Sequence, residues 1–283
     1  AWTRLTEKIR IVVAELDEEI VGVTCGAQHT VVMGGSEYLG NLGVHLRVSP
    51  LHQRAGIYPA MMQKFWESPP APSEIAPVSY GYISRDNAAM QQAWRNQTFW
   101  SVPPIRGLLL CSDLVDAEIG RPASPSDGSR IVEILNTSHD GEEFYSPHSV
   151  ESLTARFERA PDLYSWNSVL IGEGSMVGVW PANLKVIRET SGTRSESMRA
   201  LVLDHGFLPG YEQEFEELLR AWCSRLSDIG IDELSTFTST PSPNYEVVSR
   251  LASHLEVFDL STMNLPEPEG VSERGVYVDQ IYF

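Results

Sequence analysis

The chain has 283 residues, of which 42% are hydrophobic and 21% charged, a balance typical of a globular protein with a sizeable core. No stretch is long and apolar enough to predict a transmembrane segment, and the start Ala-Trp-Thr-Arg does not resemble a signal peptide. The net charge of −17 argues against a nucleic-acid-binding surface and would suit a cationic substrate, unless it only reflects a solvated acidic surface. We therefore expect a soluble intracellular protein, cytoplasmic or nuclear.

The first part of the chain, residues 1–111, is predicted to be rich in strands. Strands are expected at about 9–16, 19–29, 38–48, 79–84 and 105–111. A helix is expected at about 88–97, capped by Asp86-Asn87. Residues 112–130 contain many turn-forming residues and few large apolar ones, which predicts a linker.

Residues 131–283 are predicted to repeat this pattern of elements. Helices are expected at 131–137, 150–159, 211–226 and 244–254, and strands at 168–171, 175–187, 198–207 and 234–239. The predicted fold class is α/β (mixed α+β), with two lobes that each hold a central mixed twisted sheet flanked by helices.

Between these elements, one loop has the features of an anion-binding site. The strand that contains Leu46 and Val48 breaks at Pro50, crosses a short polar loop and leads into a helix. The first N–H groups of a helix lack intrahelical partners and lie at the positive end of its dipole, so a phosphate is favoured there. Gly56 allows close approach of a ligand, Arg54 adds a cation, and Pro59 suits a first helical turn.

This segment resembles motif A of the GNAT superfamily of acetyl-CoA-dependent N-acetyltransferases, which is Gln/Arg-x-x-Gly-x-Gly/Ala after a strand ending Val-x-Pro. The matching residues are Val48-Ser49-Pro50 and then Gln53-Arg54-Ala55-Gly56-Ile57-Tyr58, with Tyr58 where the family has Gly or Ala. The resemblance implies that residues 53–58 bind the pyrophosphate of coenzyme A. It also implies that the exposed backbone of Leu46, Arg47 and Val48 holds the pantetheine arm.

A second segment resembles the family's helix Asn-x-x-Ala-x-x-Leu-Tyr-x-Lys-x-Gly-Phe. The matching positions are Asn87, Met90, Ala93, Trp94, Asn96, Thr98 and Phe99. The resemblance implies that Asn87 and Trp94 contact the cofactor. Trp94 replaces a Tyr that often protonates the departing thiolate, and an indole N–H cannot serve as that acid.

The whole chain further resembles the HOOKLESS-type putative N-acetyltransferases, a two-lobed plant group. The matching stretches are residues 20–22, 46–50, 80–83, 165–166 and 276–279. A GNAT domain usually begins with one strand and two helices, which are missing here, so we expect a fragment or a first lobe without part of its substrate wall. The resemblance divides the chain into an acetyl-CoA-binding lobe (1–111), a linker (112–130) and a second lobe (131–283).

The second lobe is predicted to be a degenerate copy. Its cradle position reads Gly206-Phe207-Leu208-Pro209-Gly210-Tyr211-Glu212, without Gln-x-x-Gly. Glu212, Glu214, Glu216 and Glu217 load the start of the next helix and would repel a pyrophosphate. We therefore expect a structural or substrate-shaping role.

Catalysis in this superfamily is direct attack of an amine on the acetyl thioester, which needs a base, an oxyanion donor and a proton for the thiolate. The resemblance places the backbone N–H of Leu46 as the donor. His45 is the nearest titratable side chain and a candidate base, although strand alternation would turn it away from Leu46 and a structural histidine is the alternative. Further candidates are Tyr80, Tyr82, Glu37 and His29, or an ordered water chain.

The sequence shows no motif for a disulfide or a metal site. Cys25, Cys111 and Cys223 are isolated in apolar runs and are interpreted as buried thiols. No spacing of His, Cys or carboxylates predicts a metal site, so acetyl-CoA is the only co-substrate we expect.

Two functions remain open. One is an acetyl-CoA-dependent N-acetyltransferase acting on a primary amine, such as a lysine side chain, a polyamine or a small amine, with no nucleic-acid or membrane partner. Gln53, Gly56 and Asn87 favour it. The other is a GNAT-like binding or regulatory module without catalysis. Tyr58 and Trp94 favour it, and so does the lack of a clear catalytic base in the sequence.

Overall fold

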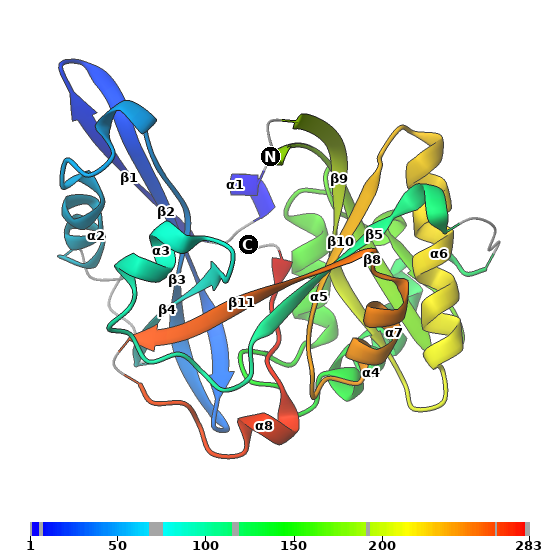
Figure 1. Cartoon of the computed structure of the whole chain (residues 1–283). Helices are drawn as coiled ribbons and strands as arrows, with labels where there is room; N and C mark the ends of the chain where they lie inside the picture. Colours follow the sequence, from blue (N-terminus) through cyan, green and yellow to red (C-terminus); the bar gives the residue numbers. More distant parts are fainter. Residues whose placement is uncertain are drawn as a thin grey trace.

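A single continuous β-sheet runs through the whole molecule (Figure 1). The structure, a computed structural model, describes residues 2–5, 8–67, 76–114, 119–190, 193–263 and 265–280. In these residues eleven strands lie in the order β1-β2-β3-β4-β11-β5-β10-β9-β8-β7-β6. The strands are β1 (Lys8–Leu16), β2 (Glu19–Met33), β3 (Ser36–Val48), β4 (Pro77–Ser84), β5 (Pro104–Leu110), β6 (Arg121–Pro122), β7 (Val169–Ile171), β8 (Ser175–Thr190), β9 (Thr193–Phe207), β10 (Glu233–Ser239) and β11 (His254–Met263).

Helices flank this sheet, which confirms the predicted mixed α/β class. They are α1 (Trp2–Leu5), α2 (Ile57–Glu67), α3 (Ala88–Ala93), α4 (Gly128–Ser138), α5 (Val150–Glu158), α6 (Glu212–Asp228), α7 (Asn244–Leu251) and α8 (Val271–Arg274). Single 3₁₀ turns lie at Pro50–His52, Cys111–Asp113, Pro125–Asp127 and Trp166–Ser168.

Most predicted elements are present within a few residues, with three differences. The helix expected over 88–97 ends at Ala93 and continues as a turn. The stretch predicted as a linker, 112–130, already contains β6, a 3₁₀ turn and the start of α4. The sequence analysis missed the short helices α1 and α8, and it missed β11 because it extended the preceding helix to His254 and expected no strand after it.

The two halves of the chain, residues 2–114 and 119–280, exchange strands. Each half holds one parallel pair, β3 with β4 and β9 with β10. The strand that follows β4 in the chain is β5, yet β5 pairs with β10. The strand that follows β10 is β11, and β11 pairs with β4 over residues 258–263 and with β5 over residues 254–257. Figure 1 shows β11 crossing from the second half into the first. The exchange joins two similar sheets into one.

The hydrophobic core is also shared between the halves. One buried cluster contains Leu42 and Tyr80 from the first half and Ile134, Phe157 and Tyr164 from the second. A second cluster lies under α6, whose apolar side chains recur every three or four residues. Burying each such side chain contributes about 1.5–3 kcal/mol, so we expect the two halves to unfold together.

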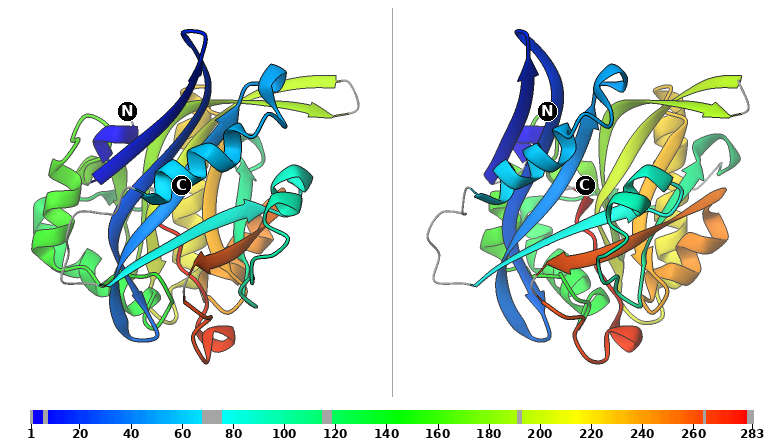
Figure 2. Two further views of the ribbon diagram at one scale, coloured as in Figure 1. Left: turned by 90° about the vertical axis from the view of Figure 1, so that its left-hand side faces the viewer. Right: turned by 60° about the vertical axis from the view of Figure 1, so that its left-hand side comes forward.

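In the first half, α2 packs against β1 and β2. Phe65 of α2 lies so close to β2 that a Cβ at Gly26 would come within 2.2 Å of its ring. The guanidinium of Arg10 on β1 lies 4.8 Å from the centre of the same ring. The views in Figure 2 show the β1–β2 hairpin extending beyond the sheet on this side and the β8–β9 hairpin extending on the other.

Three further observations concern membrane-spanning helices, metal sites and the cysteines. None of the described helices is long and apolar enough to cross a membrane. Within the same residues, no group of three or more His, Cys, Asp or Glu side chains could hold a metal ion. Cys25, Cys111 and Cys223 are free and buried, which confirms their interpretation as buried thiols.

Candidate functional site

Strands β3 and β4 separate part of the way along their length. Their parallel pairing begins at Leu39–Pro77 and stops at Leu42–Tyr80. Beyond that point β4 continues to pair with β11 through Gly81–Ser84, while β3 continues to pair with β2. The edge of β3 that follows Leu42 therefore faces a gap in the sheet.

A β-bulge lies on β3 beside this gap. The register between β2 and β3 shifts after Val23, so that two residues, His45 and Leu46, stand opposite Thr24. His45 has a φ of 54°, which turns the strand locally. His45 and Leu46 both contribute to the lining of one cavity, and the bulge interrupts the regular side-chain alternation on which the sequence-based expectation rested.

A cavity of about 420 Å³ opens at the gap, on the side of α2 and α3. We call it the donor cavity. Its walls come from β3, β4, α2, α3 and the second half, and its lining residues include Gly43, His45, Leu46, Arg47, Tyr58, Tyr80, Gly81, Tyr82, Asn87, Trp94 and Arg106. Burial and the nearby charge of Arg47 lower the pKa of His45, so its imidazole is neutral at pH 7.

The structure brings together one part of the predicted cofactor site. Leu46, Arg47, Tyr58, Asn87 and Trp94 line the donor cavity, whereas Val48, Gln53, Arg54, Ala55, Gly56 and Ile57 do not. These latter residues form the end of β3 and the loop into α2, directly beside Tyr58. Glu37, a weaker candidate for the base, lies on β3 far from the gap and pairs with Val32.

The loop before α2 has the geometry of an open anion cradle. Gly56 has a φ of 76°, and a Cβ placed there would meet no atom within 4 Å. Ala60 closes the first helical turn by donating its N–H to the Gly56 carbonyl, at 3.2 Å. The N–H groups of Ile57 and Tyr58 precede that turn, and Pro59 has none, so those two amides are the helix donors that a phosphate would meet.

The two residues that depart from the family pattern contact each other. The indole Nε1–H of Trp94 donates a hydrogen bond to the Tyr58 hydroxyl, at 2.9 Å. The Trp94 ring also lies against β4, because a Cβ at Gly81 would come within 2.9 Å of it. The pair thus joins the start of α2 to the end of α3 across the donor cavity.

Asn87 has a structural role that the sequence predicted. Its side-chain oxygen accepts a hydrogen bond from the Met90 N–H at 3.2 Å, which caps α3. Asn87 is also one of the residues that line the donor cavity. It therefore fixes the position of α3 at the wall where Trp94 also lies.

A second cavity, of about 220 Å³, lies where the C-terminal tail and the segment 144–148 meet the first half. We call it the acceptor cavity. Its lining includes His29, Leu42, Tyr80, Tyr82, Tyr145, His148, Arg156, Arg159, Tyr277 and Asp279. Among the described residues, Tyr80 and Tyr82 are common to the linings of both cavities. The two cavities therefore meet at β4, beside the gap.

Charged side chains form the floor of the acceptor cavity. Arg156 makes two hydrogen bonds to Asp279, at 2.8 and 2.9 Å, and a third to the fully buried Asp204 at 3.1 Å. Tyr164 donates to the same Asp204 carboxylate at 2.6 Å. Burial opposes ionisation of Asp204, but the Arg156 charge outweighs it and holds the pKa of Asp204 below its usual range. Burial and the charge of Arg156 lower the pKa of His148.

Sequence reasoning missed most of this floor. Arg156 and His148 lie in the second half, and no local pattern relates them to strands of the first. Asp279 belongs to the Val-Tyr-Val-Asp stretch that the sequence analysis had singled out, which was the one available signal. That stretch gave no indication of where the tail lies.

The second half contains an equivalent gap, which its own tail fills. Strands β9 and β10 pair in parallel from Arg199–Glu233 to Leu201–Ser235 and then stop. The buried side chain of Gln280 lies there and donates to the carbonyls of Val202 and Ser235, at 2.7 and 3.2 Å. At the start of α6, the Glu214 carboxylate accepts hydrogen bonds from the N–H groups of Glu173 and Gly174. Protein atoms therefore fill this gap, and the Glu214 carboxylate is bound by the turn between β7 and β8.

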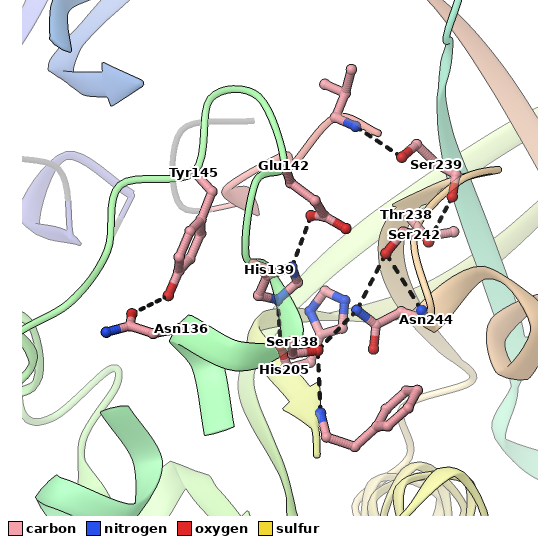
Figure 3. A network of polar contacts seen from close by, with 12 residues as sticks. Asn136, Ser138, His139, Glu142, Tyr145, His205, Thr238, Ser239, Ser242 and Asn244 are labelled. Carbon is pink, nitrogen blue, oxygen red and sulfur yellow. Dashed lines mark hydrogen bonds and ion pairs between the residues drawn. The ribbon is translucent and has the colours of Figure 1, made fainter. Parts of the chain in front are cut away.

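A network of polar side chains lies in the second half, around His139 and His205 (Figure 3). His139 contacts the Glu142 carboxylate through Nδ1 at 2.8 Å and the His205 carbonyl through Nε2 at 2.7 Å. Both partners are acceptors, so His139 carries a proton on each nitrogen. Burial opposes that charge, but Glu142 outweighs it and raises the pKa of His139. His205 is also buried, and its two ring nitrogens have no hydrogen-bond partner among the described residues.

His205 should make the protein less stable in mild acid. Burial and the charge of His139 lower its pKa to about 3, whereas in the unfolded chain it has its usual value of about 6.5. Below pH 6.5 the unfolded state therefore binds a proton that the folded state excludes. The free energy of unfolding should fall by about 1.4 kcal/mol per pH unit from this residue as the pH is lowered.

Urea denaturation between pH 7 and pH 5 measures this effect. In His205→Phe the acid slope should decrease by that amount, whereas Phe207→Leu, which alters the same aromatic cluster, should keep it. An unchanged slope in His205→Phe would contradict the assignment of a buried neutral imidazole.

The sequence matches no protein-family model and no curated protein. Among solved structures, the chain is similar to Saccharomyces cerevisiae N-myristoyltransferase with bound myristoyl-CoA, with a TM-score of 0.57 and 8% identity. That match covers 90% of this chain and 66% of the other, slightly less than two thirds of its length. A GCN5-related N-acetyltransferase from Sphaerobacter thermophilus gives a TM-score of 0.54 and 13% identity, over 91% of this chain and 82% of that one. Such low identities concern the fold, and the fold of this chain is GNAT-like, with two lobes that resemble N-myristoyltransferase in arrangement.

Proposed function

We propose that this protein is an acetyl-CoA-dependent N-acetyltransferase that moves an acetyl group to a primary amine by direct attack. One observation carries the proposal: a gap between two parallel strands lies at the meeting point of two cavities. An acyl donor in one cavity and an amine in the other would meet beside Tyr80 and Tyr82. Each substrate would then have its own entrance.

The residues of the donor cavity fit coenzyme A. The loop 53–58 offers free space at Gly56 and the N–H groups at the start of α2 for the pyrophosphate. The edge of β3 after Leu42 lacks a β4 partner, so its backbone can bind the amide groups of the pantetheine arm. The N–H of Leu46, within the bulge, is the proposed oxyanion donor. Bound acetyl-CoA would supply the activated acyl group.

The net charge of the chain favours a cationic amine as the acceptor. Asp279 presents a carboxylate in the lining of the acceptor cavity, although Arg156 and Arg159 add positive charge beside it. Because Arg156 already pairs with Asp279, a protonated amine is attracted mainly over a longer range, by the net charge of −17. We propose a lysine side chain, a polyamine or a small amine as the acceptor.

We propose that the second lobe of the predicted domain division, residues 131–283, is a degenerate copy that binds no acyl-CoA. Gln280 fills its gap, and Glu214 places a carboxylate at the start of its long helix. The second half instead supplies the walls of the acceptor cavity, through segment 144–148, Arg156 and the C-terminal tail. We further propose, from the resemblance of short stretches along the chain, that the protein belongs to the two-lobed HOOKLESS-type group.

The alternative is a GNAT-like module that binds acetyl-CoA, or another ligand, without catalysis. The Tyr58–Trp94 hydrogen bond favours it, because it joins the walls of the donor cavity and places an indole where the family has an acid. The same bond is compatible with an enzyme if the thiolate leaves without an acid, since thiols ionise with a pKa of about 8.5.

Calorimetric titration with acetyl-CoA and CoA, followed by a thiol-release assay, tests the proposal. We expect a single equivalent of acetyl-CoA to bind per chain, and CoA to be released when spermidine or a lysine peptide is added. Binding without release for any amine would favour the non-catalytic module. The absence of binding would refute the donor site, and two equivalents would refute the proposed role of the second half.

Replacing Trp94 should change cofactor affinity more than turnover. Trp94→Phe removes the hydrogen bond to Tyr58, and Tyr58→Phe removes its acceptor, so each should weaken acetyl-CoA binding by about 0.5–1.5 kcal/mol, or up to about tenfold. The double variant should lose less than the sum, because both changes remove one bond. A thousandfold loss of kcat in Trp94→Phe at unchanged affinity, about 4 kcal/mol of barrier, would show that Trp94 takes part in the chemistry.

A further inference from the structure

We propose that Tyr80 deprotonates the acceptor amine and passes the proton to His29, so that these two residues form the base that sequence reasoning could not locate. The inference rests on the proposed function, because it concerns the proton of the same reaction. It starts from position: Tyr80 lies in the walls of both cavities, at the place where an amine and a thioester would meet.

The two residues form a hydrogen-bonded pair across three strands. The Tyr80 hydroxyl on β4 lies 2.8 Å from Nε2 of His29 on β2. β3 runs between them, and its residue opposite His29 is Gly40, where a Cβ would come within 3.1 Å of the Tyr80 ring. The missing side chain at position 40 therefore lets the ring lie across β3. With the proton on Nδ1, Nε2 is the acceptor for the Tyr80 hydroxyl.

Packing holds the Tyr80 ring in this position. Phe144 lies 4.7 Å from it and Tyr82 lies 5.8 Å from it, ring centre to ring centre. Phe144 is itself fixed to the end of β2, because its N–H donates to the Val32 carbonyl at 2.7 Å. Tyr80 is 4% exposed, so its hydroxyl has little contact with bulk solvent. A proton on it can move to His29 or toward the two cavities that Tyr80 lines. The tyrosine thus has a fixed direction rather than a mobile side chain.

Tyr80 is chosen over Tyr82, which also lines both cavities, because of its hydrogen bond to the His29 imidazole. Other titratable groups line the acceptor cavity. They are Tyr82 on β4, Tyr145 and His148 after α4, Arg156 and Arg159 at α5, and Tyr277 and Asp279 in the tail. Arg156 and Arg159 are permanent cations, and Asp279 is held by two hydrogen bonds from Arg156. His148 lines only the acceptor cavity, and His45 lines only the donor cavity.

The proton balance of the reaction is complete with this pair. The ammonium gives one proton to the Tyr80 oxygen as Tyr80 gives its own proton to Nε2 of His29, which becomes an imidazolium. The neutral amine then forms a C–N bond with the carbonyl carbon, and the C–S bond breaks with its electron pair on sulfur. The second proton of the nitrogen goes to the thiolate, directly or through water, and His29 returns its proton to solvent. Tyr80 is the catalytic residue, and His29 orients it and accepts its proton.

Acceptors of different charge test the proposal. Tyr80→Phe should lower kcat for spermidine by about a hundredfold at pH 7, while the Kd of acetyl-CoA stays within about twofold. The loss should shrink for aniline, which is uncharged at pH 7, and for spermidine as the pH is raised toward the pKa of its amines. His29→Gln, which keeps a hydrogen-bonding side chain, should show the same dependence on pH and on the acceptor. Tyr38→Phe, a similar change in the same core, serves as the control.

Three results would overturn the inference. One is a Tyr80→Phe variant that transfers acetyl to spermidine at the wild-type rate. Another is an equal loss for spermidine and aniline at every pH, since a merely structural defect does not depend on the charge of the acceptor. The third is a wild-type protein that acetylates no amine, which would refute the proposed function together with the inference. The first two leave the proposed function intact.

Discussion

Replacing Gly56 with glutamate should abolish acetyl-CoA binding while the protein still folds. Gly56 precedes α2, and a side chain there would point into open space, since no protein atom lies within 4 Å of a Cβ. A carboxylate would then occupy the proposed position of the pyrophosphate. Two like charges 4 Å apart near a protein surface repel by about 4 kcal/mol, which corresponds to about a thousandfold loss of affinity.

The matched control is Gly210→Glu. Gly210 also has a positive φ, of 90°, has no atom within 4 Å of a Cβ, and precedes a helix, α6. Both variants should therefore lose a similar amount of stability, about 1–2 kcal/mol, from the left-handed backbone. Calorimetric titration should show normal binding in Gly210→Glu and none in Gly56→Glu. If Gly56→Glu melts like the control and binds acetyl-CoA with the wild-type Kd, the cradle assignment is wrong.

Arg156→Met should lower the free energy of unfolding by about 3–5 kcal/mol. Arg156 neutralises Asp204, which is fully buried, and Asp279, whose side chain is 16% exposed. Methionine fills a similar volume but leaves both carboxylates without their cation. Because Asp204 would be the buried charge left uncompensated, Arg156→Met/Asp204→Asn should recover part of the loss.

Urea denaturation measures this effect, and Arg4→Met is the control. Arg4 makes a comparable two-pronged contact with Asp162, but both side chains are more than half exposed, so water and salt screen the pair. We expect little change in that variant. A loss in Arg156→Met no larger than in Arg4→Met would mean that the buried network contributes little to folding.

The local elements of the fold could be read from the sequence because their causes are local. Helix α6 follows from apolar side chains spaced three or four residues apart, and it is found within two residues of its predicted bounds. The helix cap at Asn87 was predicted from residue type, and the structure has it. The cradle loop depends on Gly56 and on the start of a helix, both of which short-range patterns reveal.

Strand pairing could not be read in the same way. The segment 254–263 alternates apolar and polar residues well enough to suggest a strand, but nothing in it indicates that β4 and β5 would be its neighbours. Those pairings join residues about 150–180 positions apart, and their free energy comes from a register and a shared core that exist only in the folded chain. The bulge at His45 is equally invisible, because it depends on the partner strand β2.

The sequence by itself determined the α/β class, most helices and strands, and the loop proposed to bind the cofactor. Only the tertiary structure decided that Tyr58 and Trp94 contact each other, and that Tyr80 reaches His29 over Gly40. It also decided that the C-terminal tail fills the gap between β9 and β10 with Gln280 and lines the acceptor cavity with Asp279. The physical reason is that propensities and caps act over a few residues, whereas a site is built from side chains that distant segments bring within hydrogen-bonding distance.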